Sequence, residues 1–382
     1  MNPKRVWKKG RFVLVLAVLA GLVVLLTGCI SGVNEVGWSG GTVSNNTLFV
    51  GARSGRLVSI NLETEGVQKA EQLKSTQSTG LLGCSPYSGC SGGSSGVAIY
   101  GSPVVSNGLV YIAGYNGRVY AYEESNITTQ RWVYPMNDKI SSIVGTIVVN
   151  NGKLFFGDTD GIFYCLDAMT GDLIWKETTG DRIWGTAAVS GDVVYIGSFD
   201  KNLYAFNISD GSQKWMFTAD GAIMAQPLVE DGVIYLGVLN KVLYALNEND
   251  GSVRWRFEAV DSWFWATPVL VDGKVYAPNL DGNVYILDAA SGSLVSHYDL
   301  EYGVSSNPVI SGDFVIIANR EGLIYAINTQ DNKLRNLANI NTTVNGALTA
   351  YDGIIYIQTD AGQIARVDAD TGSILQPLVV SS

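Results

Sequence analysis

A unit of about 40 residues repeats along most of the chain, and it constrains the fold more than any other feature. Residues 185–224 show the unit plainly: a small-residue run at 186–190, strand-like runs at 193–197 and 203–207, and a final run around Trp215. Short polar and glycine-containing turns separate these runs. Four short strands in about 40 residues are the period of one blade of a β-propeller.

The unit occurs eight times. Equivalent positions are about 40 to 44 residues apart, except for about 62 residues between the first two. We call these equivalent positions the anchors of the repeat: Gly40, Ser102, Thr146, Thr186, Gln226, Thr267, Asn307 and Ala347. Because stacked repeats share one core, the sequence predicts a single all-β domain over residues 40–382, an eight-bladed β-propeller of four-stranded antiparallel blades. We expect residues 33–38 to close the ring by pairing with residues 374–380.

The N-terminus has the features of a secretion signal. Residues 1–10 are basic, residues 12–26 are apolar and uncharged, and Leu26-Thr27-Gly28-Cys29 follows. The apolar run is shorter than the ~20 residues that cross a bilayer, which favours a signal peptide at 1–28 over an uncleaved anchor helix. The tetrapeptide resembles the lipobox of bacterial lipoproteins. This resemblance implies a lipid on Cys29, a tether at 29–39 and an extracytoplasmic protein held at the cell membrane or outer membrane.

The charge balance limits the classes of partner. The chain has 25 basic and 35 acidic residues, and five of the basic ones precede the first apolar run. The rest of the chain therefore has a net charge of −15. Such a body disfavours nucleic acid and anionic membrane surfaces as partners, and it also serves solubility. We expect no nucleic-acid binding.

An insertion at residues 74–100, rich in Ser and Gly, explains the long first spacing. It contains Cys84 and Cys90, which can form a disulfide outside the cytoplasm. The only histidine, His297, is far away in the sequence, which argues against a metal site at these cysteines. We expect His297 to lie on an outer strand.

The segment from Asp167 to Trp175 reads Asp-Ala-Met-Thr-Gly-Asp-Leu-Ile-Trp, and residues 204–215 and 244–255 follow the same pattern. This pattern resembles the tryptophan-docking repeat of quinoprotein-type propellers, and the resemblance covers nearly all of residues 40–380. We expect Trp132 to play the same part in the second blade. The family includes dehydrogenases that use pyrroloquinoline quinone. It also includes non-catalytic lipoproteins, among them the propeller subunit of the outer-membrane β-barrel assembly machinery.

The second group is the better match, because a lipobox and about 350 residues after it fit those lipoproteins. A quinone dehydrogenase would imply a bound Ca²⁺ and often a vicinal Cys-Cys pair, and the sequence has no Cys-Cys dipeptide. We expect no cofactor, no metal and no catalytic residue. Acidic residues recur at the hairpin turns, and we interpret them as turn formers, with calcium or substrate ligation as the alternative. These residues are Asp158, Asp160, Asp200, Asp281 and Asp360.

One group of large apolar residues falls in the loops between blades, where other copies have small or polar residues. The group comprises Trp184, Met224, Trp263, Phe264 and Trp265. Exposed aromatic clusters rimmed by charge mark partner or ligand surfaces. The alternative is that these side chains plug the channel or pack between blades.

The sequence therefore predicts a lipid-anchored, non-catalytic scaffold. Its expected partners are envelope proteins or extended polypeptides, and we expect it to be a monomer within a larger complex. The alternatives are a quinone-dependent dehydrogenase and a propeller that binds carbohydrate or another small ligand.

Overall fold

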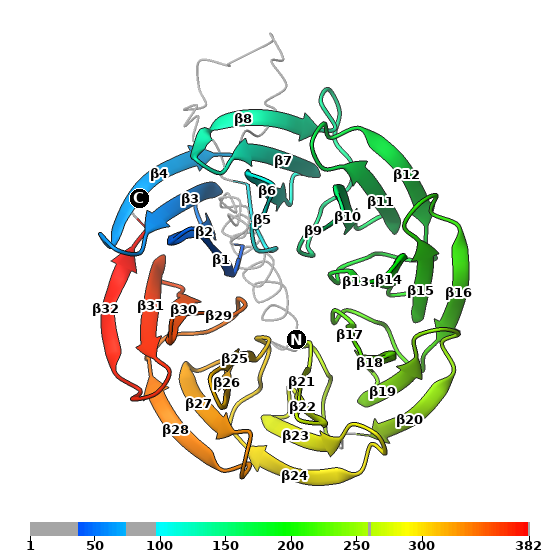
Figure 1. Ribbon diagram of the computed structural model, residues 1–382, viewed down its shortest axis with the longest axis vertical. Helices are drawn as coiled ribbons and strands as arrows, with labels where there is room; N and C mark the ends of the chain where they lie inside the picture. Colours follow the sequence, from blue (N-terminus) through cyan, green and yellow to red (C-terminus); the bar gives the residue numbers. More distant parts are fainter. Residues whose placement is uncertain (1–36, 74–96, 259–260, 381–382) are drawn as a thin grey trace, which may run out of the picture. The chain divides into compact units, whose positions relative to one another are not determined.

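The computed structural model describes residues 37–73, 97–258 and 261–380. These residues form 32 strands in eight four-stranded antiparallel sheets, which follow one another around a ring in chain order (Figure 1). In each sheet the first strand lies nearest the centre of the ring and the fourth lies at the outer rim (Figure 1). The predicted fold, an eight-bladed β-propeller, is confirmed.

Each blade takes its four strands from one continuous stretch of chain. Blades 1 to 4 consist of β1 (Gly41–Ser44), β2 (Thr47–Ala52), β3 (Arg56–Asn61), β4 (Gly66–Gln72), β5 (Val104–Ser106), β6 (Leu109–Gly114), β7 (Arg118–Glu123), β8 (Asn126–Tyr134), β9 (Val148–Asn150), β10 (Lys153–Gly157), β11 (Ile162–Asp167), β12 (Leu173–Thr178), β13 (Ala188–Ser190), β14 (Val193–Gly197), β15 (Asn202–Asn207) and β16 (Gln213–Thr218). Blades 5 to 8 consist of β17 (Leu228–Glu230), β18 (Val233–Gly237), β19 (Val242–Asn247), β20 (Val253–Glu258), β21 (Val269–Val271), β22 (Lys274–Pro278), β23 (Asn283–Asp288), β24 (Leu294–Asp299), β25 (Val309–Ser311), β26 (Phe314–Ala318), β27 (Leu323–Asn328), β28 (Leu334–Asn339), β29 (Thr349–Tyr351), β30 (Ile354–Gln358), β31 (Gln363–Asp368) and β32 (Ile374–Val379).

The middle strands of a blade are covered on both faces by the neighbouring blades. In blade 4, every residue of β14 is buried and so are the four central residues of β15, whereas β16 alternates between exposed and partly buried residues. This explains why the middle strands are continuously apolar and only the outer strand shows the two-residue alternation of a half-exposed strand.

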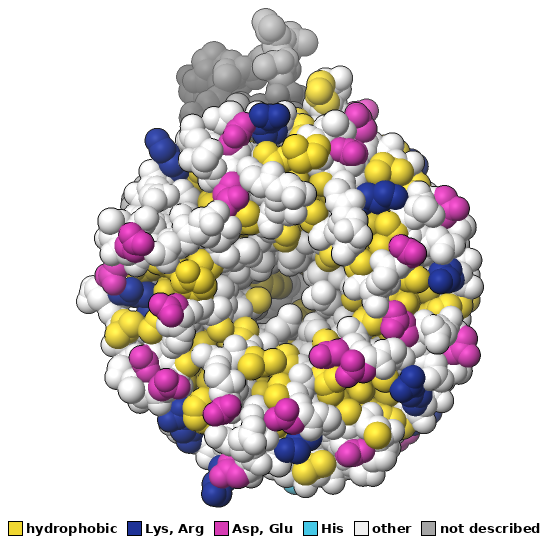
Figure 2. Space-filling view, in the orientation of Figure 1, with side chains coloured by type: hydrophobic (Ala, Val, Ile, Leu, Met, Phe, Trp, Pro, Cys, Tyr) yellow, Lys and Arg dark blue, Asp and Glu magenta, His cyan; other side chains and the backbone are white. Residues whose placement is uncertain are grey.

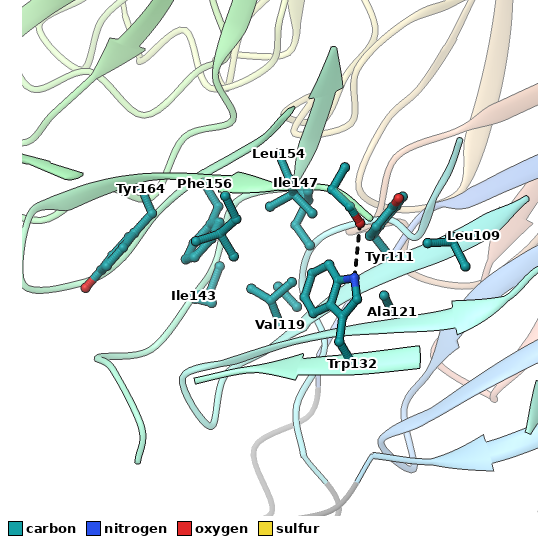
Figure 3. Close-up of a cluster of buried hydrophobic side chains, with 13 residues drawn as sticks. Leu109, Tyr111, Val119, Ala121, Trp132, Ile143, Ile147, Leu154, Phe156 and Tyr164 are labelled. Atoms are coloured by element: carbon teal, nitrogen blue, oxygen red, sulfur yellow. Dashed lines mark hydrogen bonds between the residues drawn. The ribbon is translucent and has the colours of Figure 1, made fainter. Parts of the chain in front are cut away.

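An apolar cluster fills each of the eight interfaces between neighbouring blades. Figure 3 shows the one between blades 2 and 3, where Trp132 and Tyr111 of blade 2 meet Leu154 and Phe156 of blade 3. A blade has no core of its own, because its two faces are buried only when both neighbours are in place. The ring is therefore a single folding unit, as expected of stacked repeats.

Four of these interfaces are fixed by the predicted tryptophan. Its indole Nε1 donates a hydrogen bond to a backbone carbonyl in the third-to-fourth-strand turn of the next blade; the bond of Trp132 is drawn in Figure 3. The predicted role of Trp132 is thus confirmed. The four bonds are Trp132 to Ala168 (3.0 Å), Trp175 to Ile208 (3.0 Å), Trp215 to Glu248 (3.1 Å) and Trp255 to Ala289 (2.9 Å).

The glycine of the turn that receives the indole has two roles. Gly211 has a φ of +77°, which residues with a side chain adopt only at a cost. A Cβ atom on Gly211 would also lie only 2.8 Å from Cδ2 of Trp175. The glycine therefore both permits the turn and leaves room for the ring of the preceding blade.

Two glycine variants separate these roles. Gly232 has a similar φ of +74°, but a Cβ there would meet nothing within 4 Å. We expect Gly211→Ala to lower the free energy of unfolding by about 1–3 kcal/mol more than Gly232→Ala, because only the former displaces Trp175. Urea denaturation followed by far-UV circular dichroism measures the difference. Equal losses in the two variants would show that indole docking contributes nothing beyond the turn.

The later blades lack the tryptophan and are joined by other side chains. Arg335 of blade 7 donates to the carbonyl oxygens of Ala369 (2.9 Å) and Asp370 (2.7 Å) in blade 8, in the same turn that tryptophan reaches elsewhere. Its guanidinium carbon lies 4.3 Å from the centre of the Phe314 ring. In blade 6, the Tyr298 hydroxyl donates to the carbonyl of Asn332. A different donor can therefore make the same kind of contact between blades.

The predicted pairing of residues 33–38 with residues 374–380 is not seen among the described residues. Within the described part of the chain, β32 pairs only with β31 and β1 pairs only with β2. Gly37 and Trp38 form no strand, and residues 33–36 lie outside that part. The physical reason is that the first and last blades each have four strands of their own. Neither needs a strand from the other end of the chain.

Closure instead uses side chains from both ends. An apolar cluster joins β2 and β3 to Tyr356, Ile364 and Leu378 of blade 8. The Gln358 amide donates to the Gly51 carbonyl (3.0 Å) and accepts from the backbone N–H of Ser39 (3.1 Å). Arg366, whose side chain is 8% exposed, pairs with Glu65 at 2.7 Å. A second ion pair, Arg53–Asp360 at 3.2 Å, also joins the two blades. Packing, hydrogen bonds and ion pairs therefore join the first and last blades without a shared strand.

The Arg366–Glu65 pair makes the closure sensitive to pH. The hydrogen bond from Arg366, and next its positive charge, lower the pKa of Glu65. The pair therefore stabilises the folded chain above the ordinary glutamate pKa, and this contribution is lost as the pH falls through the lowered value. We expect Glu65→Gln to lower the Tm at pH 7, and the difference from wild type to shrink once the pH falls below the ordinary glutamate pKa of about 4.3 and to disappear below the lowered pKa.

Glu321→Gln is the matched control, because Glu321 is exposed and lies in a turn of blade 7. Its Tm should follow that of the wild type at every pH. A Glu65→Gln defect that persists unchanged at acid pH would contradict an electrostatic role.

Candidate functional site

A cavity of about 260 Å³ lies at one end of the central channel. All eight anchor residues of the repeat line it, and we call them the anchor belt: Gly40, Ser102, Thr146, Thr186, Gln226, Thr267, Asn307 and Ala347. A second cavity, of about 470 Å³, shares Gln226, Thr267 and Asn307 with the first. The two cavities therefore adjoin at the anchor belt. Figure 2 shows one face of the ring, which is hollowed at its centre.

Side chains of the anchor belt tie neighbouring blades together. The backbone N–H of Ser102 donates to the hydroxyl of Thr146 (3.1 Å), and the N–H of Thr146 donates to the hydroxyl of Thr186 (2.9 Å). The N–H of Thr267 likewise donates to Oδ1 of Asn307 (2.8 Å). These bonds fix the inner ends of the blades, so the wall of the cavity is part of the rigid scaffold.

A second set of residues, each two positions before an anchor, lines the same cavity, and we call it the mouth belt. Five of its members are large and apolar. The belt consists of Trp38, Tyr100, Val144, Trp184, Met224, Trp265, Ser305 and Asn345. Three of the five residues predicted to form a surface, Trp184, Met224 and Trp265, thus lie together at the cavity.

The other two predicted residues lie elsewhere. Trp263 is 44% exposed and is not among the residues that line the cavity. Phe264 is 1% exposed and packs against Tyr285 and the backbone of Gly237, so its assignment to an exposed surface is wrong. The reason is its place in the repeat. Three positions before the anchor, every blade from the third to the eighth has a buried apolar residue: Ile143, Ile183, Ile223, Phe264, Val304 and Val344.

Sequence reasoning missed Trp38, Tyr100 and Tyr115. Trp38 contacts Tyr100 edge-on with ring centres 4.6 Å apart, and Tyr100 contacts Tyr115 in the same way at 5.3 Å. Trp38 and Tyr100 occupy the same repeat position as Trp184. This shared repeat position could have identified both residues. Trp38 was instead assigned to the predicted tether at 29–39 and Tyr100 to the predicted insertion at 74–100.

Two of the residues that line this cavity each have a polar side-chain atom with no hydrogen-bond partner among the described residues. These atoms are the indole Nε1 of Trp184 and the hydroxyl of Ser305, and both atoms are buried. Phe199 contacts the Trp184 ring edge-on at 4.9 Å, and the Arg182 guanidinium lies 5.9 Å from its centre. The Trp184 ring is therefore held in place while its N–H stays unused.

Three of the five acidic turn residues, Asp158, Asp200 and Asp281, accept hydrogen bonds within their own turns, as predicted, whereas the Asp360 carboxylate pairs with Arg53 of blade 1 at 3.2 Å. The Asp158 carboxylate, 1% exposed, accepts from the backbone N–H groups of Asp160 and Ile162 (3.0 Å each) and from the Tyr164 hydroxyl (2.9 Å). Asp200 and Asp281 accept in the same way from the tyrosines of their own blades. Burial, followed by the nearby Asp158 carboxylate, raises the pKa of Tyr164. In the described part of the chain, no three His, Cys, Asp or Glu side chains are grouped as a metal site requires.

Of the remaining candidate residues, the two that the structure describes, Cys165 and His297, do not line the cavity. Cys29, Cys84 and Cys90 lie outside the described residues. Cys165 is buried and has no disulfide, and burial raises the pKa of its thiol to about 12. His297 is exposed on the outer strand β24, as predicted. None of the described residues forms a helix with the length and hydrophobicity needed to span a membrane.

A family model described as outer membrane protein assembly factor BamB matches residues 42–177 and 167–376. The chain belongs to this family. The repeat is thus PQQ-like, as the tryptophan-docking pattern indicated. A curated member of the family, outer membrane protein assembly factor BamB of Legionella pneumophila (strain Paris), is 29% identical over 83 residues. That stretch covers 22% of this chain and about a fifth, 20%, of the length of the relative.

Two solved structures share the fold. The crystal structure of the computationally designed Ika8 protein aligns with a TM-score of 0.71 and 15% identity, over 88% of this chain and 97% of the designed one. The crystal structure of BamB from Moraxella catarrhalis aligns with a TM-score of 0.50 and 20% identity, over 69% of this chain and 95% of that one. At these identities the likeness is one of fold.

The role of the acidic turns can be tested with calcium. We expect Asp158→Ala to lower the free energy of unfolding by about 1–3 kcal/mol, because it leaves the Tyr164 hydroxyl without its acceptor. Asp160→Ala in the same turn is the control and should change it by less than about 0.5 kcal/mol. Thermal denaturation should give the same Tm with millimolar Ca²⁺ and with EDTA. A calcium-dependent rise in Tm that Asp158→Ala abolishes would assign the turn to a metal.

Proposed function

We propose that this chain is a non-catalytic protein-binding scaffold of the cell envelope that acts in outer-membrane protein assembly. The observation that carries the proposal is the mouth belt, in which five large apolar side chains converge on one cavity of a rigid ring. Aromatic residues gathered in a recess are the usual centre of a binding surface, because they bury a large area at little entropic cost. Membership in a family described as an outer membrane protein assembly factor supports the same role.

The turn geometry favours a scaffold over a quinone dehydrogenase. Such an enzyme needs several oxygen ligands that converge on a calcium ion. The carboxylates of Asp158, Asp200 and Asp281 instead accept hydrogen bonds within their own blades. These acceptors are committed to the fold, and they belong to three different blades.

A lipid on Cys29 is part of the proposal. Leu26-Thr27-Gly28-Cys29 resembles a lipobox, and Trp38 of the mouth belt comes nine positions after Cys29. A stretch of that length reaches about 30 Å at most. The scaffold would then work close to a membrane surface, where newly exported envelope proteins pass.

Site-specific photo-crosslinking in cells tests the proposal on the full chain. A photoreactive amino acid replaces Trp265 in the mouth belt, and in a control it replaces Val253, which is 46% exposed on the outer strand β20. We expect position 265 to crosslink to one or a few proteins that mass spectrometry identifies as envelope proteins, and position 253 not to give these products. The same products from both positions, or none from position 265, would contradict a scaffold that binds through its mouth.

A further inference from the structure

The mouth belt has the donors, the apolar surface and the surrounding charge to recognise one kind of segment. We propose that it binds an extended polypeptide stretch in which basic residues flank an apolar side chain. The Trp184 indole N–H would donate to a main-chain carbonyl of this stretch. This inference rests on the proposed function and specifies what the scaffold binds.

The unused Trp184 N–H identifies the kind of group that must enter. An indole nitrogen can only donate, and a buried donor without a partner costs about 1–3 kcal/mol. A ligand that brings an acceptor to this atom recovers that cost. The hydroxyl of Ser305, which also has no partner among the residues that the structure describes, can donate or accept. A peptide main chain offers both acceptors and donors at regular spacing, and it meets both requirements.

The apolar part of the cavity is suited to a side chain. Trp38 and Trp265 line this cavity and also an adjoining one of about 250 Å³. Together with Met224 they give the mouth broad, non-directional surfaces that do not require one exact shape. An apolar residue of the bound segment would lie against these surfaces while its backbone reaches Trp184.

The loops around the mouth favour a positively charged segment. These are the connections between the second and third strands of each blade and those between successive blades. The described residues of these loops include eleven acidic and six basic ones. Two of the six, Arg53 and Arg182, are already paired with acidic residues of these loops, Asp360 at 3.2 Å and Asp181 at 3.4 Å. Lysine and arginine are also the side chains that interact favourably with the faces of tryptophan rings.

A carbohydrate is a poorer fit to the same cavity. Sugars are recognised through many hydroxyl groups, which need many free polar partners. Here the hydroxyls of Thr146 and Thr186 and the amide oxygen of Asn307 already accept bonds from neighbouring blades. An oligosaccharide is therefore the competing ligand that the experiment must include.

Isothermal titration calorimetry of the full chain in detergent tests the inference with defined probes. The probe is the blocked peptide acetyl-Gly-Lys-Phe-Lys-Gly-amide. Matched peptides replace both lysines by glutamate or the phenylalanine by alanine, and a maltose oligomer represents sugars. We expect the Lys-Phe-Lys peptide to bind at least tenfold more tightly than either matched peptide and more weakly as salt increases. Preference for the glutamate peptide or for the oligosaccharide would overturn the inference.

The role of the indole N–H has its own variant. Trp184→Phe keeps an aromatic ring beside Phe199 and Arg182 but removes the donor. We expect it to weaken binding of the Lys-Phe-Lys peptide about fivefold. Trp263→Phe, in an exposed residue that does not line the cavity, should change binding by less than about twofold. Circular dichroism and Tm verify that both variants fold, and equal affinities in the two would contradict the assignment of Trp184.

The two proposals can fail separately. Crosslinks from position 265 to envelope proteins, together with no preference among the peptides, would refute the charged-segment inference and leave the scaffold in place. Peptide binding of the expected kind without any envelope crosslink would instead refute the assembly role.

Discussion

The rest of this structure depends on the contact between neighbouring blades, because no blade can bury both of its faces alone. The indole of Trp175 shows how the contact works: the ring fills apolar space, and its N–H satisfies a carbonyl of the next blade at 3.0 Å. A buried carbonyl without a partner would be costly, so one side chain provides both the packing and the hydrogen bond. Where tryptophan is absent, Arg335 combines the same two functions by lying against Phe314 while it donates to Ala369.

The repeat made the fold predictable. Period, turn residues and the tryptophan pattern are local in sequence, and each recurs often enough to outweigh the ambiguity of a single short strand. The closure of the ring was not predictable in this way. It is set by contacts such as Gln358 to Gly51 and Arg366 to Glu65, which join residues about 300 positions apart and occur only once. A periodic signal carries no information about a contact that does not repeat.

The residues of the candidate site can be predicted by comparing equivalent positions of the repeat. Grouping large aromatic residues by type alone is not sufficient. Phe264 and Trp265 look alike as large aromatic residues, but one is buried between blades and the other lines the cavity. Successive side chains of an extended segment point to opposite sides, so adjacent positions have different surroundings. The same argument identifies Trp38 and Tyr100, which the irregular spacing at the start of the chain concealed.

The positions three and two before the anchor are adjacent in the chain but have different roles in the ring. The position three before the anchor holds the blades together and is uniformly apolar in blades 3 to 8, from Ile143 to Val344. The position two before the anchor varies from Trp184 through Val144 to Ser305 and Asn345, although all of these line the same cavity. Because this position holds residues as different as Trp184, Ser305 and Asn345 in one ring, the lining of the channel can vary from blade to blade without loss of the ring. The concentration of large apolar side chains on one part of the mouth belt is therefore a property of the site, and stability of the fold does not require it.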